Sequence, residues 1–138
     1  MKLFSVTICF LLLFGCGKKI VENDLKNLNG YWEIAKVKLP NGETKEYTVN
    51  PTVDYIELDA MKGFRKKLQP KFNGTYSASD DADRFTIKKI ENQFIIIYIN
   101  SLTAREEQLI ALSKDAFTVK NSENISYFYK RYKPININ

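Results

Sequence analysis

Short apolar runs separated by turn residues make up the chain from residue 31 to residue 132. The runs cover residues 31–39, 46–49, 52–58, 63–69, 71–78, 84–90, 93–99, 106–112, 116–120 and 125–132. Several of them place apolar residues at alternate positions, which is the periodicity of a β-strand. No helix-period segment is long enough to connect parallel strands. The pattern predicts an all-β domain of about eight or nine antiparallel strands, folded as an up-and-down barrel or a sandwich.

One or two helical turns are expected over residues 22–29, ahead of the first strand. Asn23 is a suitable N-cap, and Leu25 and Leu28 fall on one face at i and i+3. Gly30 then ends the helical pattern.

The N-terminus carries an apolar segment, residues 3–14, which follows Lys2. It is shorter than the roughly 20 residues that a membrane-spanning helix needs, and it has the layout of a secretory signal. The string from residue 13 to Cys16, Leu-Phe-Gly-Cys, resembles the bacterial lipobox. That resemblance implies a lipoprotein signal peptide over residues 1–15 and a diacylglycerol on the Cys16 sulfur. The other interpretation is that Cys16 is an ordinary buried cysteine close to a leader.

If the lipobox resemblance holds, residues 16–24 form a lipidated tether and the membrane is a partner. The resemblance then implies an envelope lipoprotein on the periplasm-facing side of the outer membrane, since no acidic residue follows Cys16 before Glu22.

Composition narrows the chemistry further. The chain contains no histidine, which removes the commonest general base and the commonest transition-metal ligand. Its formal net charge of +5 is moderate and does not by itself indicate nucleic-acid binding. Cys9 lies within the leader and Cys16 would carry lipid, so no disulfide is expected. We therefore predict no catalytic residues, no metal, no cofactor and no nucleic-acid partner.

The Gly30-x-Trp32 motif after a short helical turn resembles the start of lipocalin-like domains, including small lipoproteins of Bacteroidetes. The resemblance covers about residues 25–133 and leaves 134–138 as a tail. It implies that Trp32 closes the base of the barrel and that a basic residue of the last strand packs over its ring. Arg131 is the candidate for this basic residue.

Strict alternation in the first strand would put Trp32 and Ile34 on one face with Lys36 and Lys38. A β-bulge near Ala35 or Lys36 would correct this and leave the lysines in solvent. Without a bulge, the lysines would face the barrel mouth and could bind a carboxylate or phosphate head group.

The lipocalin-like resemblance implies that the barrel binds or carries a small hydrophobic or amphipathic ligand. The candidates for the lining of its cavity are Phe72, Tyr76, Phe94, Ile96, Tyr127 and Tyr129. The alternative is a non-enzymatic interaction module that docks onto an envelope protein complex or forms a homodimer. Its candidate interface is Ile95, Ile97 and Ile99, because residues 93–99 are apolar on both faces. Cover by the helical turn or by a loop would also explain this second apolar face.

Two charged clusters have simple interpretations. The run Arg65-Lys66-Lys67 is expected on a solvated or lipid-facing edge strand, where lysines discourage edge-to-edge pairing. The acidic residues between 79 and 83 lack the spacing of a calcium loop and are expected to form a solvated turn.

Overall fold

The computed structural model describes residues 18–78, 81–99 and 104–134. A 3₁₀ helix, η1 (Glu22–Leu28), precedes all the strands. The strands are β1 (Gly30–Lys38), β2 (Thr44–Glu46), β3 (Val53–Asp59), β4 (Lys62–Pro70), β5 (Tyr76–Ala78), β6 (Asp83–Ile90), β7 (Gln93–Ile99), β8 (Ala104–Leu112), β9 (Ala116–Asn121) and β10 (Ser126–Arg131).

No helix within the described residues is long and apolar enough to cross a membrane. The predicted signal peptide, residues 1–15, and the predicted lipidation site Cys16 lie outside the described residues.

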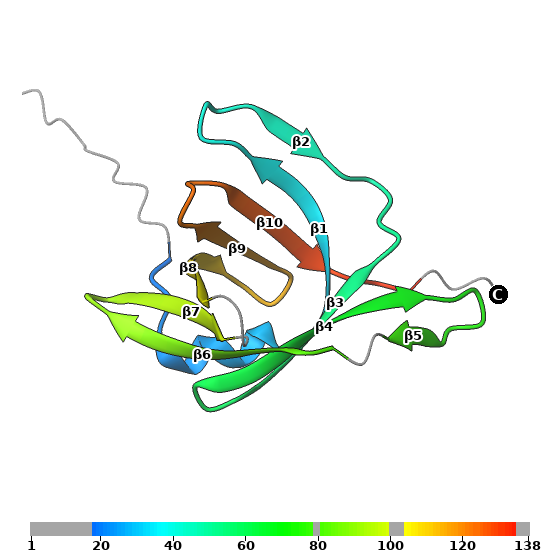
Figure 1. Ribbon diagram of the computed structural model, residues 1–138, viewed down its shortest axis with the longest axis horizontal. Coiled ribbons are helices and arrows are strands. Elements are labelled where there is room, and N and C mark those ends of the chain that lie inside the picture. Colours follow the sequence, from blue (N-terminus) through cyan, green and yellow to red (C-terminus); the bar gives the residue numbers. More distant parts are fainter. Residues whose placement is uncertain (1–17, 79–80, 100–103, 135–138) are drawn as a thin grey trace, which may run out of the picture.

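Eight of the strands close into a barrel. They pair in the order β1-β3-β4-β6-β7-β8-β9-β10, and β10 returns to pair with β1. Every pairing is antiparallel, and Figure 1 shows β1 and β10 side by side where the ring closes. The prediction of an antiparallel up-and-down barrel with a short N-terminal helical turn is confirmed.

The two short strands extend the barrel at one end. β3 pairs with the first residues of β1, from Gly30, whereas β2 pairs with its last residues, up to Lys38. In the same way β4 pairs with β6 near its start and with β5 near its end at Pro70. The β4–β5 hairpin therefore projects beyond the ring of strands (Figure 1).

A β-bulge in β1 sets the direction of its side chains. The register with β10 shifts between Ile34 and Lys36, so the predicted bulge is confirmed. After the shift Val37 lies opposite Tyr127, and the ammonium group of Lys36 lies 4.4 Å from the ring centroid of Phe128. Lys36 thus lies on the outer face, and the alternative prediction of a lysine-lined mouth is wrong.

The apolar core fills the half of the barrel that η1 closes. Its fully buried side chains include Trp32, Phe94, Phe117, Leu25, Leu28, Ile87 and Val119. η1 contributes Leu25 and Leu28 to this cluster. Its N-cap is Val21, whose backbone N–H donates to Asp24, so the predicted cap at Asn23 is wrong.

Candidate functional site

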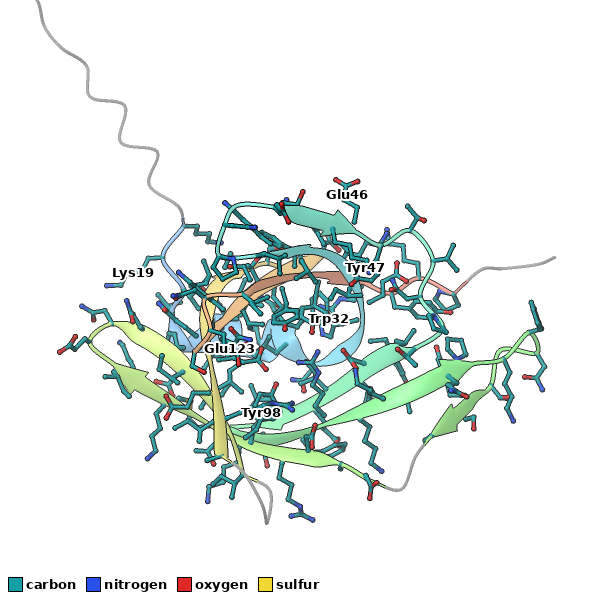
Figure 2. The ribbon with its side chains drawn as sticks, turned by 45° about the horizontal axis from the view of Figure 1, so that its top comes forward. Lys19, Trp32, Glu46, Tyr47, Tyr98 and Glu123 are labelled. Atoms are coloured by element: carbon teal, nitrogen blue, oxygen red, sulfur yellow. The ribbon has the colours of Figure 1, made fainter. Side chains whose placement is uncertain are left out.

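Trp32 and Arg131 meet at the base of the barrel. Trp32 is fully buried, and the guanidinium carbon of Arg131 lies 3.8 Å from the centroid of its ring. The guanidinium also donates hydrogen bonds to the backbone carbonyls of Asn27, Asn29 and Lys114, at 2.6–3.0 Å. Figure 2 shows Trp32 among the strands. This end of the barrel is closed by cation–π contact and by hydrogen bonds to backbone carbonyls.

Gly30 is required by the same arrangement. Its φ of +119° lies in the region that disfavours side chains, and a Cβ placed there would lie 2.6 Å from Nη1 of Arg131. Nε1 of Trp32 donates to the carbonyl of Leu28 at 2.8 Å, which ties the strand to the end of η1. The Gly-x-Trp motif therefore has a structural explanation in its own contacts.

A pocket of about 610 Å³ opens at the opposite end of the barrel, which we call the mouth pocket. Among the described residues, six acidic and three basic side chains line it. The acidic residues are Asp54, Asp81, Asp83, Glu106, Glu107 and Glu123, and the basic residues are Arg65, Lys67 and Arg105. The lining thus carries a surplus of carboxylates although the whole chain has a formal net charge of +5.

Arg65 is buried at the centre of this charged region, with 8% of its surface exposed. Its Nη2 donates to Oδ2 of Asp54 at 2.6 Å, and its Nη1 donates to the hydroxyl of Tyr98 at 3.2 Å. Its guanidinium carbon also lies 4.8 Å from the ring centroid of Tyr129. Nζ of Lys67 adds a second bond to Asp54 at 3.2 Å.

These contacts fix the charge state of the pair. Burial alone would raise the pKa of Asp54, but Arg65 and Lys67 offset this and lower the pKa below its ordinary value. Burial opposes the charge of Arg65, yet Tyr98, Tyr129 and Asp54 together raise its pKa well above the usual range. Asp54 and Arg65 are therefore both ionised at neutral pH.

The two inner tyrosines remain protonated. Burial raises the pKa of Tyr129 to about 12 and also raises the pKa of Tyr98, although Arg65 acts in the opposite direction on both. A guanidinium also lies over each ring: that of Arg105 is 4.3 Å from the ring centroid of Tyr98, and that of Arg65 is 4.8 Å from the ring centroid of Tyr129. Tyr98 and Tyr129 are therefore uncharged side chains whose rings make cation–π contacts with Arg105 and Arg65.

Glu107 differs from Asp54 because no described residue donates a hydrogen bond to its carboxylate. Its side chain is 9% exposed, and the nearest cation is Nε of Arg105, 4.0 Å from Oε1. Arg105 itself is bonded to Asp83, with Nη2 and Oδ2 3.3 Å apart. Burial raises the pKa of Glu107, and the partial compensation by Arg65 and Arg105 does not cancel this effect.

The predicted lining residues fall into three groups. Tyr127 and Tyr129 line the mouth pocket. Phe94 and Ile96 face inward, but they lie in the filled apolar core and not at this pocket.

Phe72 and Tyr76 lie elsewhere. Phe72 is fully exposed between β4 and β5, so the prediction that it lines a cavity is wrong. Tyr76 stacks on Tyr31 with ring centroids 5.2 Å apart, and Tyr31 points away from the interior because Trp32 points into it. The inward position predicted for Tyr76 is therefore also wrong.

The predicted interface residues lie on the outer face of β7, opposite Phe94 and Ile96. Ile95 and Ile97 are half-buried, whereas Ile99 is 64% exposed and borders an open surface hollow of about 1070 Å³. η1 does not cover this face, because its leucines pack into the interior of the barrel. The expected cover by the helical turn is therefore wrong.

Sequence reasoning missed the charged residues of the mouth pocket. β4 pairs with β3, β5 and β6 and its Arg65 is buried, so the interpretation of the basic run as a solvated edge strand is wrong. Alternation could have revealed two of the others, because Asp54 precedes the inward Ile56 and Glu107 precedes the inward Leu109 by two residues. In the acidic cluster, Asp81 and Asp83 line the pocket and residues 79–80 lie outside the described residues.

Comparison of the sequence with protein-family models and with curated proteins gives no match. Comparison with solved structures finds a lipocalin-like protein from Bacteroides uniformis ATCC 8492, at 10% identity and a TM-score of 0.48. That match covers 77% of this chain and 99% of the other. Lobster apocrustacyanin A1 matches at 12% identity and a TM-score of 0.46, over 88% of this chain and 75% of that one.

Proposed function

We propose that this barrel binds a small amphipathic molecule in the mouth pocket. The observation that carries the proposal is a pocket of about 610 Å³ with buried ionised groups in its wall. Its volume falls within the roughly 300–1,000 Å³ of small-molecule sites. Burying charged groups costs free energy, which is more readily explained by binding than by stability.

The polar head of the ligand would occupy the mouth. Below it the interior is filled by Trp32, Phe94 and Phe117, so a long apolar chain would find no space among the described residues. The proposal thus narrows the hydrophobic or amphipathic ligand expected from the sequence to a compact amphipathic one.

We also propose that Cys16 anchors the barrel to the cell envelope. The Leu-Phe-Gly-Cys string and the short apolar segment before it support this anchor. Mass spectrometry of the intact protein should show a diacylglycerol on wild-type Cys16, and Cys16→Ser should move the protein from the membrane fraction to the soluble fraction. An unmodified cysteine in the wild-type protein would refute the anchor.

The ligand proposal is tested by native mass spectrometry of the full-length protein purified from its own membrane in mild detergent. Ser122→Trp places a large side chain at the rim of the pocket, and Ser77→Trp makes the same change on β5, away from it. We expect a small-molecule adduct on the wild-type protein and on Ser77→Trp, and a reduced adduct on Ser122→Trp. An adduct unaffected by Ser122→Trp, or none on any of the three proteins, would refute binding in the mouth pocket.

A second candidate function is protein docking through the outer face of β7, which the exposure of Ile99 favours. Ile97→Lys would place a charge at the centre of that face. If the face is an interface, the variant should stay folded and elute as a smaller species than the wild type in size-exclusion chromatography. An unchanged elution volume for Ile97→Lys would exclude self-association through this face. Recovery of the wild-type protein without any bound protein would exclude docking onto an envelope protein complex.

A further inference from the structure

Glu107 is a buried residue whose carboxylate accepts no hydrogen bond from any described residue. It faces the interior from β8, with Ile96 of β7 and Asn121 of β9 as its strand neighbours. A buried ion usually has a direct partner, because removal from water costs several kcal/mol. Here no described residue donates a hydrogen bond to the Glu107 carboxylate, and Arg105 stops at 4.0 Å.

The basic residues of the pocket are already engaged. Arg65 and Lys67 both bond to Asp54, and Arg105 bonds to Asp83. None of the three makes a hydrogen bond to Glu107. Only Arg105 approaches Glu107, as an ion pair at 4.0 Å without a hydrogen bond, so the Glu107 carboxylate is an acceptor that no described residue bonds to directly.

A metal ion does not fit this position. No group of three His, Cys, Asp or Glu side chains among the described residues is arranged to hold one. A single carboxylate instead suits an ammonium group, which needs one anionic acceptor and a few neutral ones.

We propose that the mouth pocket binds a protonated primary amine with a short apolar body, and that Glu107 is its counter-ion. This inference rests on the proposed ligand-binding function and names the class of ligand. Tyr127 supplies the apolar wall: it lines the same pocket, and no described cation lies over its ring. Glu107 lies on β8, where it pairs with Asn121 of β9, and Tyr127 lies on β10, where it pairs with Val119 of β9. Two strand spacings and a two-residue offset along the strands therefore separate them by about 12 Å. That distance matches an ammonium group joined to one aromatic ring or a short alkyl chain.

The experiment is isothermal titration calorimetry of the full-length protein with three probes of one carbon skeleton. The probes are 3-phenylpropylamine, 3-phenylpropan-1-ol and 3-phenylpropionate, which are cationic, neutral and anionic at pH 7. Charge-assisted hydrogen bonding to Glu107 should favour the amine over the alcohol by about tenfold or more. Glu107→Gln, which keeps the side-chain shape, should remove this preference.

Two further variants separate the possible failures. Glu57→Gln makes the same charge change at an exposed position of β3 and should keep the preference for the amine. Tyr127→Ala should weaken the amine and the alcohol alike, because it removes apolar contact without touching the counter-ion. Circular dichroism checks that each variant is folded.

The outcomes distinguish the two proposals. If the alcohol or the acid binds the wild type as tightly as the amine, the ligand class is wrong and the binding function stands. If Glu107→Gln keeps the preference for the amine, the assignment of the counter-ion is wrong. If none of the three probes binds any of the folded proteins, the inference fails together with the mouth pocket as a site for compact amphipathic molecules.

Discussion

The two ends of this barrel each hold a buried aromatic ring with an arginine beside it, and they use the arginine differently. At the base, Arg131 covers Trp32 and gives its hydrogen bonds to backbone carbonyls. At the mouth, Arg65 lies beside Tyr129 and bonds to a carboxylate and a phenol. Two of the carbonyl acceptors at the base, those of Asn27 and Asn29, lie at the end of η1, where they would otherwise lack partners.

The comparison teaches that a similar cation–aromatic contact can close a fold or equip a site. At the base, the guanidinium of Arg131 donates to three backbone carbonyls and covers Trp32, so none of its nitrogens is left for a ligand. In the mouth, the Asp54–Arg65 pair is satisfied but Glu107 is not, and the carboxylates outnumber the basic residues. The proposed site therefore lies at the end of the barrel where one buried carboxylate has no direct hydrogen-bond donor among the described residues.

The largest expected effect is at the base. Trp32→Ala would remove a fully buried indole and should lower the free energy of unfolding by about 3–5 kcal/mol. Urea unfolding at pH 7 measures this, with Phe72→Ala as the control. Phe72 is fully exposed, so its loss should change stability by no more than about 0.5 kcal/mol. Equal losses in both variants would contradict the account of the base.

The next effect is at the mouth. Arg65→Met would leave Asp54 buried with only the exposed Lys67, and should cost about 3 kcal/mol at pH 7. Because the folded pKa of Asp54 is lowered, its contribution is present above the ordinary value of 3.8 and disappears as pH falls through the folded pKa. Thermal unfolding of both proteins from pH 7 to pH 2.5 should therefore show a shrinking difference. A constant difference would mean that Arg65 stabilises by packing alone.

A smaller effect tests the glycine of the base. Gly30→Ala combines a positive φ with a clash against Arg131 and should cost about 2–3 kcal/mol. Gly74→Ala is the matched control: its φ is also positive, at +82°, but a Cβ there meets nothing within 4 Å. Backbone strain alone should cost about 1 kcal/mol at that position. If chemical denaturation gives the same loss of stability for Gly30→Ala and Gly74→Ala, the position of Arg131 does not depend on the absence of a side chain at residue 30.

The smallest effect has the opposite sign. The folded pKa of Glu107 is raised, so ionising it is harder in the folded protein, and stability falls as pH rises through its titration. Glu107→Gln should therefore raise the melting temperature slightly at pH 7 and have little effect below the ordinary pKa of 4.5. The charged groups acting on it are Arg65, Arg105 and Asp54. A variant less stable than the wild type at pH 7 would show that the carboxylate is compensated in the ligand-free protein.

The sequence was sufficient for the fold because strand pattern and turn chemistry agree. β7 has the predicted limits, Gln93–Ile99, and buries alternate residues as expected. Glu91 and Asn92 both have positive φ, which is the conformation of a two-residue hairpin turn. The bulge in β1 followed from the same alternation, since lysines would otherwise have faced the interior.

The charged residues of the mouth pocket could not be predicted from the sequence, because the alternation in β4 suggests that the face carrying Arg65 is the solvent-exposed one. Phe64 and Leu68 are apolar and lie on the face opposite Arg65, so hydrophobicity suggests that the arginine points to solvent. Only the register between β3 and β4 brings Asp54 within 2.6 Å of Arg65. Pair formation across strands depends on this register, which a single strand's periodicity does not contain.

The contacts of Arg131 at the base also determine when the barrel can close during synthesis. Arg131 bonds to the carbonyl of Asn29 across 102 residues of sequence, and β10 is the strand that seals β1. A growing chain therefore displays two unpaired strand edges until β10 has been synthesised. The barrel therefore cannot close before β10 is available. A stop codon placed before β10 would yield an open sheet with two aggregation-prone edges, and not a slightly shorter barrel.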